Sequence, residues 1–183
     1  ENVVVVCEAK NDSILFGFKW DNSHLKGRNS GNIEGYSMFK NSSVIEAGFY
    51  NSTIIIQDTL WNIIAGNTII IDTTSININN LQIDNKKQNF SINGKISENK
   101  YDKLNVKFTE FNISNLDSLF ISYGIDADGV MEGTVDLLDI YNTINFYSDL
   151  KIKNFAFNND YLGTMALKSS WDYLKQGIMI DAD

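Results

Sequence analysis

A ten-residue pattern that occurs three times in the chain places the strongest limit on its fold. Apolar residues stand at its first, third, sixth and eighth positions, a polar residue stands at the fifth, and Asn stands at the tenth. The copies begin at residues 76, 106 and 150. Because these starts are unequally spaced, they argue against a solenoid of fixed period and favour a sheet that grows by hairpins with loops of varying length. The apolar positions are Ile76, Ile78, Leu81 and Ile83; Val106, Phe108, Phe111 and Ile113; and Leu150, Ile152, Phe155 and Phe157.

Within each copy, the apolar alternation shifts by one residue between the third and sixth positions. Successive side chains of a β-strand point to opposite faces. Four apolar side chains can therefore share a face only if one extra residue is inserted between the two pairs. A β-bulge supplies that residue and bends the strand. Three bulges at the same place in the pattern predict a curved antiparallel sheet with one apolar face.

An apolar face of this kind can be covered in three ways. A second sheet covers it in a β-sandwich, and the sheet covers it by closing on itself in a barrel. An open half-pipe leaves the face free to hold a ligand such as acyl chains. The repeat alone leaves these three architectures open.

The rest of the chain also reads as mainly β, with about a dozen strands in an antiparallel meander. The chain contains no proline, which permits long uninterrupted strands. Clusters of Asn, Asp and Gly separate the strands, and residues 84–87 and 158–160 are candidate hairpin turns. The predicted strands cover residues 14–20, 53–58, 68–72, 91–97, 103–113, 130–138, 144–147, 150–157 and 165–171.

One short helix is predicted after the second copy of the repeat. Ser114 is the expected N-cap, and Gly124 is expected to end the helix. Leu116, Leu119 and Phe120 would form its apolar face.

Composition excludes several classes of function. The net charge is −8, whereas nucleic-acid binding requires a basic patch, so we expect no nucleic-acid partner. No apolar run approaches the roughly 18 residues that a membrane span needs. Since both ends of the sequence look cut, we expect residues 1–183 to be a single β-rich segment of a larger protein, with any membrane anchor outside it.

The sequence offers few residues for catalysis or metal binding. Its single histidine, His24, and its single cysteine, Cys7, exclude an ordinary Cys/His zinc site. We expect His24 in a surface loop and Cys7 packed as a small hydrophobe. Residues 126–129, Asp-Ala-Asp-Gly, resemble the start of a calcium loop but lack the remaining ligands, so a turn is predicted there. We therefore expect a non-enzymatic protein without a metal or cofactor.

The order of motifs along residues 51–183 resembles the TamB proteins of Bacteroidetes, which belong to the AsmA-like group. The resemblance rests on the run 52–63, on residues 67–72, on the first repeat copy and on residues 90–97. It continues through residues 104–138 and from Leu150 to the pair Trp171-Asp172. The order of these motifs along the chain carries the resemblance, and residues 1–50 share only the general character of the family.

This resemblance implies an open half-pipe, a β-taco-like groove, with acyl chains of phospholipid along its apolar interior. The groove would be lined by the twelve repeat residues together with Phe90 and Ile92. The parent protein would be anchored in the inner membrane, would cross the periplasm, and would assist outer-membrane assembly with a barrel partner. The alternatives from the residues are a β-sandwich adhesin or carbohydrate-binding module, whose tryptophans would stack on sugars, and a structural envelope spacer without cargo.

Overall fold

In a computed structural model of the chain, one antiparallel sheet contains fourteen strands. The structure describes residues 2–22, 27–117, 124, 126–172 and 177–183. The mainly β prediction is confirmed, and the described residues form one sheet rather than the two sheets of a sandwich. The elements are β1 (Asn2–Lys10), β2 (Ser13–Asp21), β3 (Ser30–Phe39), β4 (Ile45–Phe49), β5 (Ser52–Ile56), β6 (Thr59–Ile63), β7 (Thr68–Ile71), β8 (Ser75–Asn85), β9 (Gln88–Ser97), β10 (Lys103–Asn112), the 3₁₀ helix η1 (Ile113–Leu116), β11 (Ala127–Leu138), β12 (Asn145–Phe157), β13 (Asp160–Asp172) and β14 (Gly177–Ala182).

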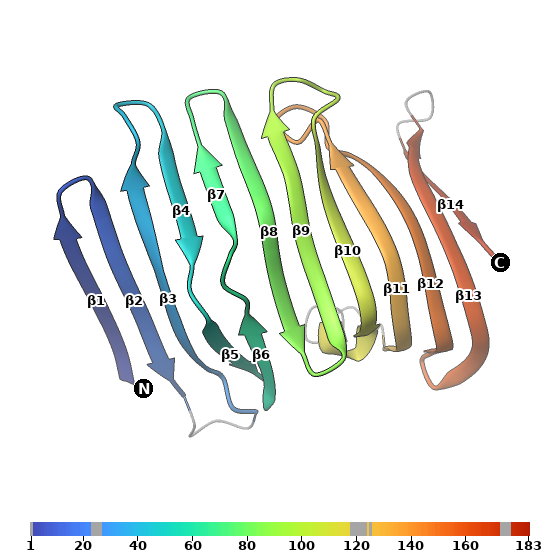
Figure 1. The fold of residues 1–183 in the computed structure, drawn as a ribbon. Helices are drawn as coiled ribbons and strands as arrows, with labels where there is room; N and C mark the ends of the chain where they lie inside the picture. The colour runs from blue at the N-terminus through green and yellow to red at the C-terminus, as the bar shows by residue number, and fades with distance from the viewer. Residues whose placement is uncertain (1, 23–26, 118–123, 125, 173–176) are drawn as a thin grey trace.

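The strands follow one another as a meander from β1 to β14, in a single layer (Figure 1). Among the described strands, this order is interrupted only by the hairpin of β5 and β6, which lies below β4 and β7 (Figure 1). Because β4 and β5 both pair with β3, they act as one long interrupted strand. In the same way, β6 and β7 both pair with β8.

Buried polar side chains replace the missing ladder bonds at this interruption. The backbone N–H of Phe49 donates to Asn67 Oδ1 at 2.8 Å, and Asn67 Nδ2 donates to the Phe49 carbonyl at 3.1 Å. Ser52 Oγ accepts from the backbone N–H of Glu34 at 2.9 Å. Asn67 and Ser52 are 3% and 2% exposed, so each satisfies backbone groups that water does not reach.

All three bulges that the repeat predicts are present. The pairing register shifts between Ile78 and Leu81, between Phe108 and Phe111, and between Ile152 and Phe155. The polar fifth residue of each copy has a positive φ: 53° at Asn80, 46° at Glu110 and 52° at Asn154. This left-handed conformation is favoured by Asn among residues with a side chain, which explains why Asn occupies the position in two copies.

In the second copy of the repeat the fifth residue is Glu110, and Glu fits the left-handed conformation less well than Asn does. Replacing it with Asn should raise the free energy of unfolding by about 0.5–1 kcal/mol, because Asn adopts positive φ at lower cost. The side chain is exposed, so little packing changes. Urea unfolding would measure the gain. Thr109→Asn, at the preceding exposed position, serves as the control and should give no gain; equal effects of the two substitutions would refute the explanation.

Both predicted hairpin turns are confirmed. Lys86 and Lys87 join β8 to β9, and Lys86 has a φ of 56°. Asn158 and Asn159 join β12 to β13 with φ of 48° and 71°, which is the pattern of a two-residue type I′ turn.

Some predicted boundaries are wrong. The strand predicted over residues 53–58 ends at Ile56, because Gln57 and Asp58 both have positive φ and form the β5–β6 turn. The strands predicted over 144–147 and 150–157 are one strand, β12. The turn predicted over 126–129 is also wrong, since β11 already begins at Ala127.

In the described residues the predicted helix begins as η1, and Asp117 directly after it also has helical geometry. Its N-cap is Asn112, whose side chain accepts from the backbone N–H of Ser114 at 3.1 Å, and Ser114 itself lies inside η1. Asn112 caps it because Ile113 already has helical geometry after the end of β10. Leu119 and Phe120 lie outside the described residues.

Asp72 fixes the turn between β7 and β8. Its carboxylate accepts from the backbone N–H groups of Thr74 and Ser75, both at 2.7 Å, and from the Ser75 hydroxyl at 2.8 Å. These bonds, first of all the one from the Thr74 backbone, lower the pKa of Asp72 from 3.8 to about 2.

The Asp72 contacts predict an acid-dependent loss of stability. A depressed carboxyl pKa stabilises the fold above the pKa of the unfolded chain, and this contribution is lost as the pH falls from about 4 to about 2. We therefore expect Asp72→Asn to be less stable than the wild type at neutral pH and closer to it at pH 2. Thermal unfolding between pH 7 and pH 2 tests this. Parallel curves for the two proteins would contradict it.

Candidate functional site

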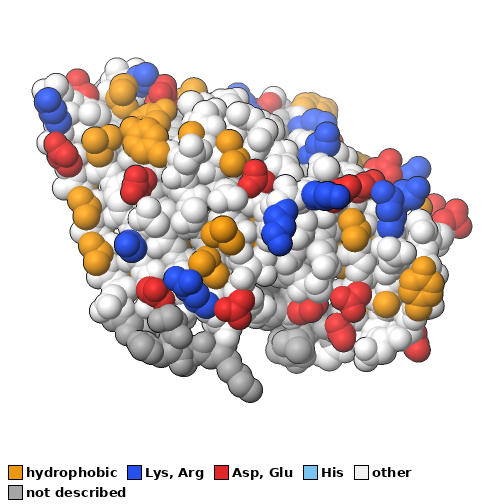
Figure 2. Space-filling model, turned by 60° about the horizontal axis from the view of Figure 1, so that its bottom comes forward, with side chains coloured by type: hydrophobic (Ala, Val, Ile, Leu, Met, Phe, Trp, Pro, Cys, Tyr) orange, Lys and Arg blue, Asp and Glu red, His pale blue; other side chains and the backbone are white. Residues whose placement is uncertain are grey.

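The two faces of the sheet have different chemistry. Ile83, Phe90 and Phe108 stand opposite one another on neighbouring strands and therefore lie on one face of the sheet. The same row of paired residues reaches Leu150 and Leu167 on β12 and β13. We call this side the apolar face and the other the polar face. On the polar face, strands are joined by contacts between charged or amide side chains, such as the pairs Lys153–Glu132 at 2.9 Å and Lys103–Asp136 at 2.7 Å. In the view of Figure 2, charges of both signs are interspersed, and apolar side chains form only small groups.

No second layer covers the apolar face in the described part of the chain. The accessible surface is 11686 Å², whereas a compact monomer of 20.7 kDa exposes about 8900 Å². The fully buried apolar residues are few, and most side chains on the apolar face are half-buried by their neighbours alone. A layer of this kind leaves apolar surface available to a ligand.

The apolar face contains a cleft of about 330 Å³, which we call the aromatic cleft. Trp61 of β6 contacts Phe111 of β10, with ring centroids 5.8 Å apart, and Phe90 of β9 at 6.3 Å. In a flat sheet, β6 and β10 would lie about 14 Å apart, because β8 and β9 run between them. The ring contact therefore requires the sheet to bend toward its apolar face here. The cleft is lined by Ile54, Ile56, Gln57, Thr59, Trp61, Ile83, Phe90, Phe111, Ser114, Asn115, Leu116 and Asp117.

One end of the aromatic cleft is polar and is formed by η1. Gln88 Oε1 holds η1 in place by accepting from the Asn112 backbone N–H and from Asn115 Nδ2, each at 2.8 Å. Asp117 lies at the same end of the cleft. Burial, and then repulsion from Asp126 and Asp128, raises the pKa of the Asp117 carboxyl. The cleft thus combines an apolar floor with a polar end, as an amphiphilic ligand requires.

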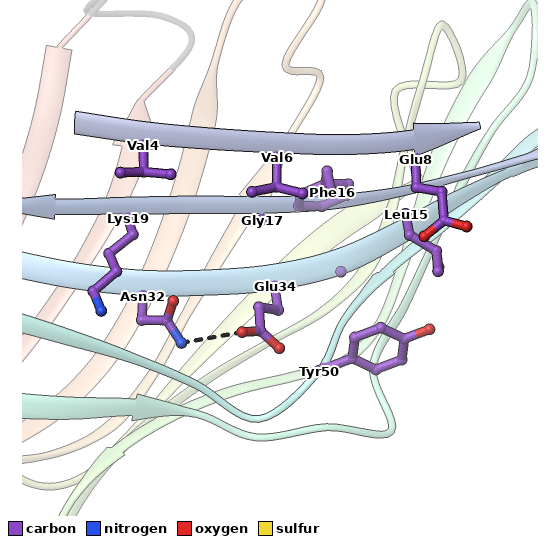
Figure 3. A pocket seen from close by; sticks show the side chains of 11 residues that line it. Val4, Val6, Glu8, Leu15, Phe16, Gly17, Lys19, Asn32, Glu34 and Tyr50 are labelled. Carbon is purple, nitrogen blue, oxygen red and sulfur yellow. Dashed lines mark hydrogen bonds between the residues drawn. The ribbon is translucent and has the colours of Figure 1, made fainter.

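A second cleft, of about 360 Å³, lies on the polar face across β1, β2 and β3, and we call it the polar hollow. Val4 and Val6 of β1 form one side, and Gly17 leaves space at its floor (Figure 3). Asn32 and Glu34 lie on the other side, where Asn32 Nδ2 donates to Glu34 Oε1 at 3.2 Å (Figure 3). Its mixed lining lacks the continuous apolar surface of the other face.

The residues predicted for the groove lie on the apolar face, and they differ in how deeply their side chains are buried. Four are buried in the aromatic and aliphatic cluster that Trp61 and Met131 also join, and they act as packing residues: Phe111, Ile113, Leu150 and Ile152. Phe157 is 41% exposed at the end of β12, and it is not among the residues packed against that cluster. The others are half-buried: Ile76, Ile78, Leu81, Ile83, Phe90, Ile92, Val106, Phe108 and Phe155.

Sequence reasoning missed Trp61 and Met131, which are 6% exposed each and belong to the cluster. The alternation of Trp61 with Ile63 was an available signal for the face that Trp61 occupies. Met131 stands directly opposite both Phe111 and Ile152, a contact that the sequence does not reveal without the register.

The prediction that Cys7 is packed as a small hydrophobe is wrong. Cys7 is exposed, because it lies on the edge strand β1. His24 lies outside the described residues. Within the described ranges, no group of three or more His, Cys, Asp or Glu residues is arranged to hold a metal ion. No helix in the same part of the chain is long and apolar enough to cross a membrane.

Comparison with known proteins gives no relative for this chain. It matches no protein-family model, no curated protein and no solved structure. The functional assignment therefore rests on the geometry of the sheet and on the sequence.

Proposed function

We propose that the chain is a non-enzymatic segment of a groove that holds and conducts the acyl chains of phospholipids. The observation that carries the proposal is the apolar face, which is continuous across the sheet and uncovered in the described residues. Burying an acyl chain on such a surface contributes about 0.8 kcal/mol per CH₂ group. Head groups would remain in water or at the polar end of the aromatic cleft.

Half-buried side chains form the track in this proposal, and buried ones hold its shape. Ile92 of β9 stands between Leu81 of β8 and Val106 of β10, so the three make one apolar row across the sheet. In the neighbouring row, Leu104 of β10 stands opposite Leu137 of β11, so the apolar surface continues onto β11. A lipid moving along these rows would meet no charged side chain on them, and diffusion along them would need no chemical step.

The resemblance of residues 51–183 to TamB proteins supports a wider proposal about context. The parent protein is anchored in the inner membrane and crosses the periplasm. It passes phospholipid toward the outer membrane and assists assembly there with a barrel partner. The half-pipe is the shape that this role requires, and the bend that brings Trp61 to Phe111 is consistent with it.

Native mass spectrometry of the purified chain tests whether it carries lipid. We expect adducts with the masses of phospholipids at a near-stoichiometric level, and organic extraction should release the same molecules. The reason is that the uncovered apolar face is more stable with acyl chains on it than in contact with water. A clean mass without adducts after gentle purification would contradict the proposal and would favour a spacer without cargo.

A carbohydrate-binding role requires aromatic ring faces that are open to a sugar. Trp61 is 6% exposed and packs against Phe90 and Phe111. The ring of Trp20 lies over Gly31, where it occupies the space that a Cβ atom would take. No specific observation favours the adhesin or carbohydrate-binding alternative over the groove.

A further inference from the structure

The polar end of the aromatic cleft carries a negative charge that no described side chain balances. Asp117 belongs to the lining of the cleft and is half-buried. Its carboxylate makes no hydrogen bond and no ion pair with the residues that the structure describes. The charged groups that act on it, Asp126 and Asp128, are also acidic, and they add to the effect of burial in raising its pKa. A carboxylate in this position is stabilised by a cation beside it.

The lining of the cleft supplies no such cation. Apart from Asp117, its polar members are neutral: Gln57, Thr59, Ser114 and Asn115. The turn between β8 and β9 brings Lys86 and Lys87 to the same end of the sheet, but both are exposed and neither lines the cleft. Any positive charge inside the cleft would therefore have to come from a ligand.

The cationic side chains of the described strands lie on the other side of the sheet. Each lysine in these strands alternates with residues of the apolar face and so points to the polar face, as Lys151 does between Leu150 and Ile152. The single arginine of the chain, Arg28, pairs with Asp21 at 3.6 Å. Arginine and lysine are the side chains that bind phosphate groups most strongly. An anionic head group would thus meet no counter-charge on the apolar face of the described strands.

A primary ammonium group matches what the polar end offers. It brings one positive charge and three N–H donors. The Asp117 carboxylate accepts such donors, and the hydroxyl oxygens of Thr59 and Ser114 are further acceptors in the lining. These hydroxyls can also donate to a phosphate group next to the ammonium. The amide of Asn115 is less available, because its Nδ2 already donates to Gln88 Oε1 at 2.8 Å.

We propose that the polar end of the aromatic cleft binds the ammonium group of a phospholipid whose head group carries a primary amine, with Asp117 as its acceptor. Ethanolamine phospholipids belong to this class, and anionic glycerol phospholipids are disfavoured. The inference rests on the proposed function, because the acyl chains of the same lipid occupy the cleft beside Trp61 and Phe90. Head-group selection is local to the cleft, and the rest of the apolar face contacts only acyl chains.

Competition between two lipids tests the preference. The full chain is incubated with equal amounts of phosphatidylethanolamine and phosphatidylglycerol that have the same acyl chains, and native mass spectrometry gives the ratio of the two adducts. We expect the ethanolamine lipid to exceed the glycerol lipid by about fivefold, the size of effect that one partly exposed ion pair contributes. Equal adducts would overturn the inference and leave the groove standing. Absence of both adducts would contradict the groove itself, and the inference with it.

Asp117→Asn tests the residue that carries the preference. The ratio of the two adducts should fall to about one, while the total amount of bound lipid stays the same because the apolar lining is intact. Asp149→Asn is the matched control, since it removes the same charge from an exposed position on the polar face and should keep the wild-type ratio. Far-UV circular dichroism should show the same fold in both variants. An unchanged ratio in Asp117→Asn, or an equal fall in both variants, would overturn the assignment to Asp117.

The head group without acyl chains separates a lipid site from a site for a soluble amine. Glycerophosphoethanolamine at the concentration of the lipid should not displace phosphatidylethanolamine, because burial of the acyl chains supplies most of the affinity. Displacement at that concentration would assign the polar end to a soluble amine and would overturn the lipid proposal.

Discussion

Gly133→Ala should lower the free energy of unfolding by about 2–4 kcal/mol. Gly133 lies in the middle of β11 with a φ of 131°, a conformation that residues with a side chain rarely adopt. A Cβ atom there would lie 2.9 Å from Leu150 Cα and would overlap the carbonyl oxygen of Asp149. Since both atoms belong to the backbone of β12, relief requires the two strands to separate.

Urea unfolding of Gly133→Ala can be compared with that of Gly17→Ala. A Cβ atom on Gly17 would meet Val6 Cβ at 3.9 Å, an ordinary contact, and Gly17 does not have a positive φ. The control should therefore be neutral or slightly stabilising, because Ala restricts the unfolded chain more than Gly. Equal unfolding midpoints for the two variants would show that β11 and β12 are not packed as closely as described.

Ile152→Asp should be the most damaging single substitution considered, with a loss of about 4 kcal/mol or more. Ile152 is 5% exposed and stands between Met131 and Met165 on the apolar face. The substitution removes a buried aliphatic side chain and introduces a carboxyl group without a partner. Thermal or urea unfolding measures the loss.

Thr164→Asp is the matched control on the neighbouring strand. Thr164 is exposed on β13, so a carboxylate there remains in water and should change stability by less than about 1 kcal/mol. Similar stability of Ile152→Asp and Thr164→Asp would contradict the burial of Ile152. A charge intended to interrupt the lipid track without unfolding the sheet belongs instead at a half-buried residue such as Ile92.

The bulges were predictable from the sequence because they are local. The shift in alternation between Ile78 and Leu81 occupies a few consecutive residues, and the requirement to keep both on one face has one simple solution. The two-residue turn at Asn158 and Asn159 is local in the same sense, since residue type alone favours positive φ.

The aromatic cleft was not predictable in the same way. The contact of Trp61 with Phe111 joins residues on strands separated by two others, and it depends on how far the sheet bends. Alternation identifies which face a residue occupies but gives no curvature. The polar end of the cleft depends on Gln88, whose contact with Asn115 joins the start of β9 to η1.

The exposure of Cys7 also depends on information that a local pattern lacks. Five consecutive apolar residues from Val3 to Cys7 read as a buried strand. The position of β1 at the edge of the sheet leaves the same residues exposed.

Fluorescence quenching at Trp61 tests the lipid-groove proposal most directly. A Trp20→Phe, Trp171→Phe variant keeps Trp61 as its only tryptophan, and Trp61 lies in the wall of the aromatic cleft. Phospholipid with brominated acyl chains should quench its emission in a saturable way, whereas the same lipid without bromine should not. Saturable quenching would place acyl chains in the aromatic cleft, near Trp61, as the account predicts. Emission that stays unchanged at lipid concentrations well above that of the protein would contradict it.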